Sequence, residues 1–101
     1  MTAALDDLRS AFAELTDLHG WAPLQTPRNL VLALTGRVGA VASIVQWEPE
    51  NRPGPDVVTP ELRDELADCL VYLVALADSL GVDVVDDGVT RLRSAVAGAQ
   101  Q

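Results

Sequence analysis

The fold is decided by residues 59–80, which read TPELRDELADCLVYLVALADSL. The pair Thr59-Pro60 predicts a helix start, because a threonine hydroxyl can cap the first turn and proline suits the first helical position. Gly81 can end this helix in the left-handed C-cap conformation. Its apolar residues cover more than one face, as is typical of a helix that is buried on several sides. They are Leu66, Cys69, Leu70, Val71, Leu73, Val74, Leu76 and Ala77.

Similar signals predict three further helices, and no stretch indicates a strand. Apolar residues recur at three- and four-residue steps before Gly20, and Thr26-Pro27 repeats the start signal. The predicted helices run from about Ala3 to Leu18, from Pro27 to Trp47, from Pro60 to about Leu80, and from Asp83 onward, with a frayed tail at residues 98–101. The fold class predicted for the single domain 1–101 is therefore an all-α four-helix bundle.

Composition excludes several classes of partner. The formal net charge is −8, and the seven basic residues are all arginines with no basic stripe, so we expect no nucleic acid and no membrane partner. The longest apolar candidate for a span, Leu66 to Ala77, is short and contains Asp68. Cys69 is the only cysteine, and the first residues lack the features of a signal peptide, so we expect a cytoplasmic protein.

The two long central helices are too apolar for a small monomer to bury. We therefore expect subunits to pack across them as a homodimer or as a dimer of dimers. The loop at residues 48–58 contains three prolines and a glycine, and it is either a mobile lid or a simple connector.

Carboxylates on the third helix are the first candidate for chemistry. Glu65 and Asp68 are three residues apart and so share a face, although this pattern is also common on solvated helix surfaces. Mg²⁺ prefers octahedral oxygen ligands, which helical bundles supply from facing helices. The second helix has no Asp or Glu between Arg28 and Trp47, so these two carboxylates are a residual metal site that lacks its other half.

Two stretches resemble a known family. Thr26-Pro27-Arg28-Asn29-Leu30 through Gln46-Trp47, and Asp64 through Leu73, are similar to the two halves of the MazG-like, all-α nucleoside-triphosphate pyrophosphohydrolases, most of all to the dCTP pyrophosphatase branch. The resemblance implies a pocket built by helix pairs from two subunits. It also implies hydrolysis of a nucleoside triphosphate to a monophosphate and pyrophosphate, with Mg²⁺ binding the phosphates.

The sequence departs from the family pattern where that pattern binds metal. The family's Glu-x-x-Glu on the second helix falls on Arg37 and Ala40, and a further acidic position falls on Ser43. The C-terminal phosphate-contacting motif keeps only Arg91 in place of its lysine. Gln25 stands where the dCTP-cleaving branch often has a histidine.

The resemblance implies that the base end of the pocket survives. Trp21, Trp47 and Tyr72 match aromatic positions around the base, and Asn29 and Arg91 are further candidate ligand-binding residues. Aromatic side chains can stack on a base. The alternative is that these residues only pack the core.

The main hypothesis from the sequence concerns the role of Arg37. We predict that its guanidinium pairs with Glu65 or Asp68 and fills the vacated metal volume, because arginine matches carboxylate geometry. The alternative is a surface arginine beside an empty site.

Three functions fit these residues. The first is a nucleotide-binding or other flat-ligand module that has lost classical Mg²⁺-dependent hydrolysis. The second is a metal-free enzyme in which Glu65 or Asp68 acts as a general acid or base and Arg37 holds an anion. The third is weak residual hydrolysis aided by Glu48 or Glu50. No cofactor is expected, except Mg²⁺ if hydrolysis remains.

Overall fold

The computed structural model describes residues 3–49 and 53–100, and within them it contains helices and no strands. This confirms the predicted all-α class. The long helices are α1 (Ala3–His19), α2 (Pro27–Val45), α3 (Pro60–Ser79) and α4 (Val84–Ala99). Two short 3₁₀ helices, η1 (Ala22–Leu24) and η2 (Gly54–Val57), lie in the connections before α2 and α3.

The predicted helix boundaries rest on the expected caps. The backbone N–H of Asn29 donates to Thr26 Oγ1 at 3.3 Å, and that of Leu62 donates to Thr59 Oγ1 at 3.1 Å. Gly20 and Gly81 have φ values of 66° and 70°, the left-handed region that glycine adopts without steric cost. These residues fix where α1 and α3 end.

Two predicted ends differ from the structure. Helix α2 ends at Val45 rather than Trp47, because the Gln46 side chain donates to the Ser43 carbonyl and the Glu48 N–H donates to Val45. Helix α4 continues to Ala99, one residue beyond Gly98, where the frayed tail is predicted to begin. Part of the predicted loop, residues 50–52, lies outside the described residues.

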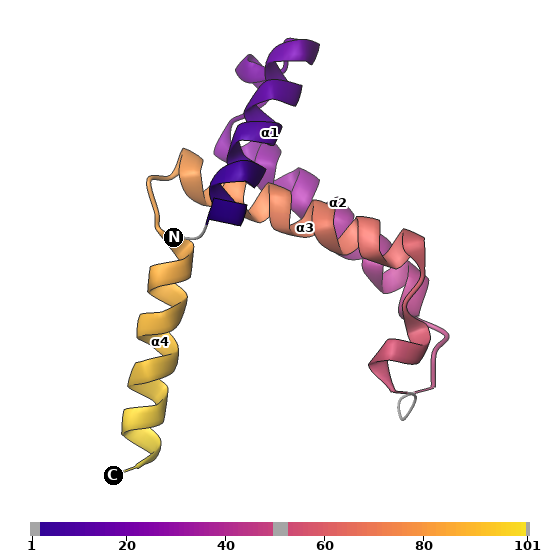
Figure 1. Ribbon diagram of the computed structural model, residues 1–101, viewed down its shortest axis with the longest axis vertical. Helices are drawn as coiled ribbons and strands as arrows, with labels where there is room; N and C mark the ends of the chain where they lie inside the picture. Colours follow the sequence, from indigo (N-terminus) through magenta and orange to yellow (C-terminus); the bar gives the residue numbers. More distant parts are fainter. Residues whose placement is uncertain (1–2, 50–52, 101) are drawn as a thin grey trace.

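Helices α2 and α3 form an antiparallel pair, and α1 leans against one end of α3 (Figure 1). The buried apolar side chains are few and lie along this contact. Two interactions tie α1 to α3: the ring of Phe12 meets Tyr72 edge-on with centroids 6.0 Å apart, and the Arg9 guanidinium binds the Asp78 carboxylate. Most of the core therefore lies where α1 meets the α2–α3 pair, while Leu62 is buried near the other end of that pair.

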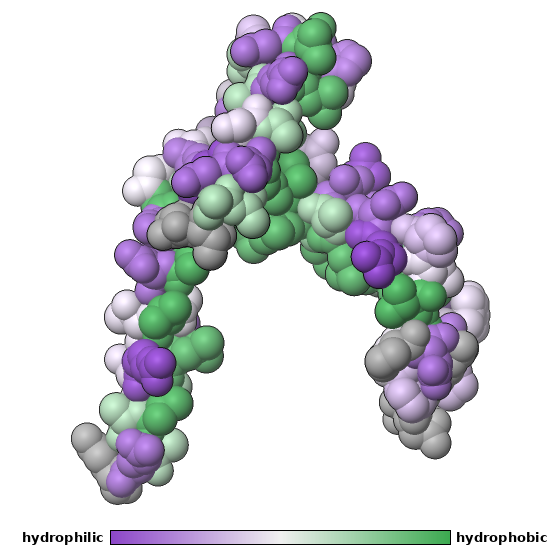
Figure 2. All heavy atoms as spheres, in the orientation of Figure 1, coloured by the Kyte–Doolittle hydropathy of each residue, from purple (hydrophilic) through white to green (hydrophobic). Residues whose placement is uncertain are grey.

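Helix α4 extends away from the other helices (Figure 1). Its apolar residues are exposed, with Leu92 at 70%, and in Figure 2 they face the inner side of an arch whose other side is the α2–α3 pair. The radius of gyration is 16.4 Å, compared with about 13 Å for a compact domain of this length. One chain alone therefore leaves the apolar faces of its long helices uncovered.

The expectation that no apolar stretch reaches membrane-spanning length was wrong for α2. Its 19 residues have a mean hydropathy of 1.3 in the most apolar window, enough to cross a membrane by length and composition alone. Arg28 and Arg37 interrupt the apolar run, but they do not lower its average below that level. A core helix of a soluble protein passes the same test, and the middle of α2 carries an ion pair to α3.

Candidate functional site

The antiparallel pairing of α2 and α3 places Arg37 against the two predicted carboxylates. Arg37 Nη1 lies 3.4 Å from Glu65 Oε2 and 3.7 Å from Asp68 Oδ2. Glu65 and Asp68 share a face because they are one turn apart on α3. The structure contains the predicted ion pair between Arg37 and these carboxylates, while the filling of a former metal volume by Arg37 stays a prediction.

The electrostatics of this cluster follow from its partial exposure. The Arg37 side chain is 43% exposed, Glu65 is 20% exposed and Asp68 is 48% exposed. The hydrogen bond to Glu65, followed by the charge of Glu65 and that of Asp68, raises the pKa of Arg37, so its guanidinium stays charged. One positive charge therefore faces two negative ones, at the edge of the solvent.

These residues do not fit a Mg²⁺ site. No group of three or more His, Cys, Asp or Glu side chains that could hold a metal ion occurs in residues 3–49 and 53–100. Two carboxylates leave an octahedral ion short of oxygen ligands, and Arg37 contributes a positive charge instead. Glu50, a possible extra ligand, lies outside the described residues.

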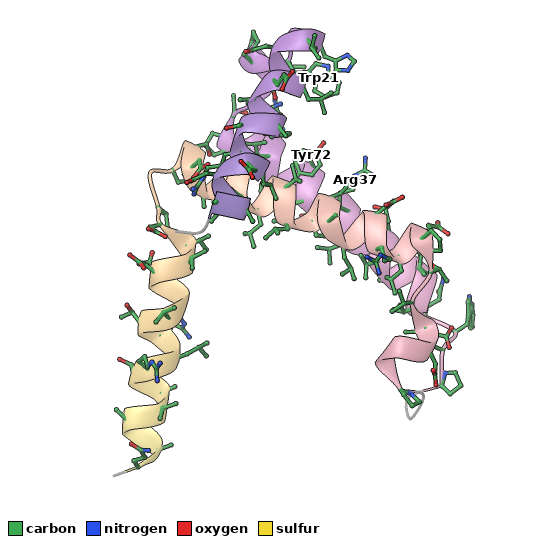
Figure 3. The ribbon with its side chains drawn as sticks, in the orientation of Figure 1. Trp21, Arg37 and Tyr72 are labelled. Carbon is green, nitrogen blue, oxygen red and sulfur yellow. The ribbon has the colours of Figure 1, made fainter. Side chains whose placement is uncertain are left out.

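Trp21 and Tyr72 line two adjoining hollows on the side of the α2–α3 pair from which Arg37 projects (Figure 3). One hollow, of about 320 Å³, also includes Asn29. The other, of about 270 Å³, also includes Asp68. Asn29 stabilises the segment before α2 that lines this hollow, because its Nδ2 donates to the Leu24 carbonyl at 3.0 Å.

Two predicted site residues do not join this group within one chain. Trp47 lies beyond the end of α2 and is 86% exposed. Arg91 lies on α4, which leads away from the hollows (Figure 1). Trp21, Asn29 and Tyr72 are therefore brought together, while Trp47 and Arg91 are not.

Gln25 and His19 were not among the residues predicted for the site. Gln25 lines the hollow that contains Asn29, and the imidazole of His19 stacks on Trp21 with ring centroids 4.4 Å apart. Gln25 could have been found, because it occupies the position where the dCTP-cleaving branch often has a histidine. The stacking of His19 depends on the turn at Gly20, which periodicity does not reveal.

Comparisons with known proteins bear on this arrangement. No family model matches the sequence. The chain is 44% identical to bovine (Bos taurus) dCTP pyrophosphatase 1 over 84 residues, which cover 79% of this chain and 50% of that protein. Human (Homo sapiens) dCTP pyrophosphatase 1 is 43% identical over the same length, with 49% of its chain covered.

The fold has a solved counterpart. A pyrophosphatase from Archaeoglobus fulgidus aligns with a TM-score of 0.84 over 100% of this chain and 96% of that one, at 22% identity. The chain spans about half the length of the curated relatives it matches. The matches in sequence and in fold agree, and the chain belongs to the MazG-like, all-α pyrophosphohydrolase family that includes the dCTP pyrophosphatases.

Proposed function

We propose that this chain is a pyrophosphohydrolase homologue that binds a nucleotide or another flat ligand and does not carry out classical Mg²⁺-dependent hydrolysis. The observation that carries the proposal is the Arg37 ion pair with Glu65 and Asp68. The guanidinium lies where the family pattern has a carboxylate, and it neutralises part of the charge that would attract the ion.

The hollows beside Trp21 and Tyr72 support the ligand-binding part of the proposal. Each has a volume near the lower end of the range for small-molecule sites, about 300–1,000 Å³. A base stacked on an aromatic face gains about 1–3 kcal/mol. Asn29 and Gln25 present amides that can pair with the edge of a heterocycle.

A second copy of the chain is part of this proposal. The accessible surface of 7517 Å² exceeds the roughly 5,500 Å² expected for a compact monomer of 10.7 kDa. The excess is larger than the share of about 800 Å² that one partner buries in a standard interface. A homodimer or dimer of dimers would cover α4 and could bring Trp47 or Arg91 of one copy toward the hollows of another. Such an assembly would bury α2 between subunits, which is consistent with a cytoplasmic protein.

A metal-free enzyme is the second candidate, and the position of Asp68 favours it. Asp68 pairs with Arg37 and also lines the hollow with Trp21 and Tyr72. A carboxylate that borders a ligand cavity can act as a general acid or base, and Arg37 could hold an anionic group of the same ligand. A turnover that is insensitive to chelators would favour this candidate over a pure binding module.

The test is a thermal-shift titration of nucleoside triphosphates and monophosphates with and without Mg²⁺. Because ligand binding to the native state raises the unfolding midpoint, we expect a shift that does not depend on Mg²⁺ and that Trp21→Leu abolishes. Trp47→Leu is the comparison variant: it should lower the shift only if a second copy supplies Trp47. A shift seen only with Mg²⁺ would overturn the proposal and indicate a working metal site.

A further inference from the structure

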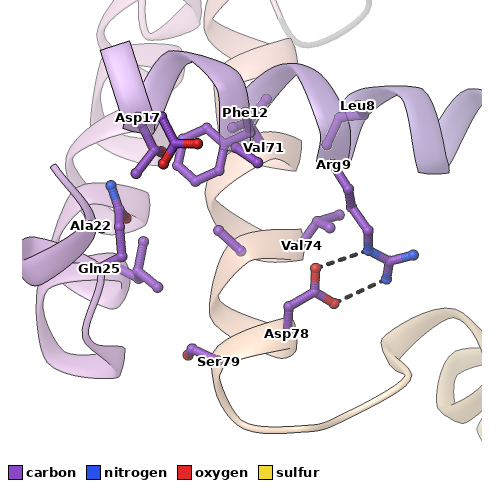
Figure 4. A pocket seen from close by; sticks show the side chains of 14 residues that line it. Leu8, Arg9, Phe12, Asp17, Ala22, Gln25, Val71, Val74, Asp78 and Ser79 are labelled. Atoms are coloured by element: carbon purple, nitrogen blue, oxygen red, sulfur yellow. Dashed lines mark hydrogen bonds and ion pairs between the residues drawn. The ribbon is translucent and has the colours of Figure 1, made fainter. Parts of the chain in front are cut away.

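A separate cavity lies between α1 and α3, on the other side of their contact from the hollow beside Asp68. It has a volume of about 330 Å³, and Arg9, Gln25, Asp78 and Ser79 surround it (Figure 4). Trp21, Asn29, Arg37, Glu65, Asp68 and Tyr72 do not line it. The cavity therefore adjoins the candidate site without including those six residues. Leu8, Phe12 and Val71 line both the cavity and the hollow beside Asp68, and Gln25 and Leu30 line both the cavity and the hollow beside Asn29.

The wall of this cavity is mainly aliphatic and aromatic, and it contains one unsatisfied polar atom. Leu8, Phe12 and Val74 supply much of the apolar wall. Thr16 also lines the cavity and is only 7% exposed, and its Oγ1 has no hydrogen-bond partner among the described residues. A buried hydroxyl without a partner is costly, so its presence points to a group that completes it.

Apart from the neutral Gln25 amide, the polar groups at the rim are already hydrogen-bonded or carry negative charge. Arg9 and Asp78 bind each other through two hydrogen bonds of 2.8 and 3.0 Å, and the Ser79 hydroxyl donates to the Leu76 carbonyl at 2.7 Å. Asp17 adds a negative charge. An anion is therefore disfavoured. A water at Thr16 would meet mostly apolar neighbours, whereas a buried water needs two to four polar partners.

We propose that this cavity is a second binding site, which takes a small, uncharged, largely apolar molecule with one hydrogen-bonding group. The apolar body of such a molecule would pack against Phe12 and Val74, and its polar group would reach Thr16 Oγ1. The volume suits a ligand at the small end of the usual range. The proposal does not depend on the nucleotide site or on its chemistry.

The probes for this site are phenol and toluene, which differ by one hydroxyl, and binding is measured by calorimetry on the intact chain. We expect both to bind, with phenol the tighter. Thr16→Val should weaken the binding of phenol about fivefold to tenfold and leave the binding of toluene unchanged, because the substitution removes only the hydroxyl. If this variant weakens the binding of both probes equally, or weakens the binding of neither, Thr16 does not have the proposed role.

A filling variant tests the location. Ala75→Leu extends a side chain into the cavity and should abolish binding of both probes, whereas Ala67→Leu makes the same change on α3 outside the cavity and should leave binding intact. Trp21→Leu should also leave phenol binding intact. If Trp21→Leu abolishes it, phenol occupies the aromatic hollow and the proposal fails. The proposal also fails if phenol binding falls as protein concentration rises, since a second copy would then cover the cavity.

Discussion

Two arginines pair with carboxylates of α3, and they do so in different ways. Arg9 meets Asp78 through two hydrogen bonds, from Nε at 2.8 Å and from Nη2 at 3.0 Å. Arg37 uses a single nitrogen, which lies 3.4 Å from Glu65 and 3.7 Å from Asp68. The first pair is a bidentate tie with one preferred geometry, while the second is a looser contact shared between two partners.

The difference shows that residue types alone do not decide what an ion pair does. The bidentate Arg9–Asp78 pair fixes α1 against the end of α3, beside the cavity that contains Thr16. The Arg37 contact sits at the edge of the aromatic hollows and has two alternative acceptors, so a ligand can replace one of them at little cost. Three predictions follow from this comparison, beginning with the largest expected effect.

The double variant Arg37→Glu/Ala40→Glu should bind Mg²⁺ between α2 and α3. We expect no such binding by the native chain. It places two carboxylates on α2 opposite Glu65 and Asp68, which supplies oxygen ligands from facing helices. Calorimetric titration with Mg²⁺ measures the gain. The matched control is Arg93→Glu/Ala97→Glu, which makes the same charge change on α4 and should bind no Mg²⁺. Equal binding by both variants would mean that charge alone attracts the ion.

Arg9→Met should lower the unfolding midpoint more than Arg37→Met does. Methionine keeps much of the apolar stem and removes the guanidinium, so each variant reports mainly on its ion pair. The Arg37 pair is partly exposed and monodentate, so its loss should cost less than about 1 kcal/mol. Thermal unfolding of both variants beside the native chain checks the order. The reverse order would show that the Arg37 contact is the structural tie.

The contribution of the two ion pairs to stability should not change in moderately alkaline solution. The hydrogen bond and charge of Asp78 raise the pKa of Arg9, and those of Glu65 raise the pKa of Arg37. A raised arginine pKa gives stability that is complete below the pKa of the unfolded chain, which lies in strongly alkaline solution, and that is lost only as the pH rises through the folded value. The midpoint difference between the native chain and Arg9→Met should therefore stay constant from about pH 7 to pH 10. A difference that shrinks in this window would assign the effect to another titrating group.

Much of the fold could be predicted from the chain alone. The predicted helix limits agree with the structure to within about two residues, because capping depends on local hydrogen bonds and on φ. The residues that gave these limits are Thr26, Thr59, Gly20 and Gly81. The pairing of Arg37 with Glu65 and Asp68 was predictable as well, since the family resemblance supplies the register between α2 and α3. The early end of α2 was not, because it depends on the side chain of Gln46 bonding back to Ser43.

The site was predicted less completely than the fold. Trp21, Asn29 and Tyr72 lie together as expected, but Trp47 and Arg91 lie on parts of the chain that lead away from them. The turn that follows α1 brings Gln25 to one hollow and stacks His19 on Trp21, which lines both hollows. Residues far apart in sequence come together only through the angles between helices, and a periodic pattern does not contain those angles.

The helices, their caps, the acidic character of the chain and the absence of carboxylates from α2 could all be read from the sequence, because each depends on residue identity or on neighbours within one turn. The packing of the helices makes Arg9 a bidentate partner of one carboxylate and Arg37 a partner shared between two, and it leaves a cavity that Thr16 helps to line. It also directed α4 away from the other helices with its apolar face uncovered. These features depend on how whole helices pack, which involves the summed contacts of many side chains rather than the preference of any one.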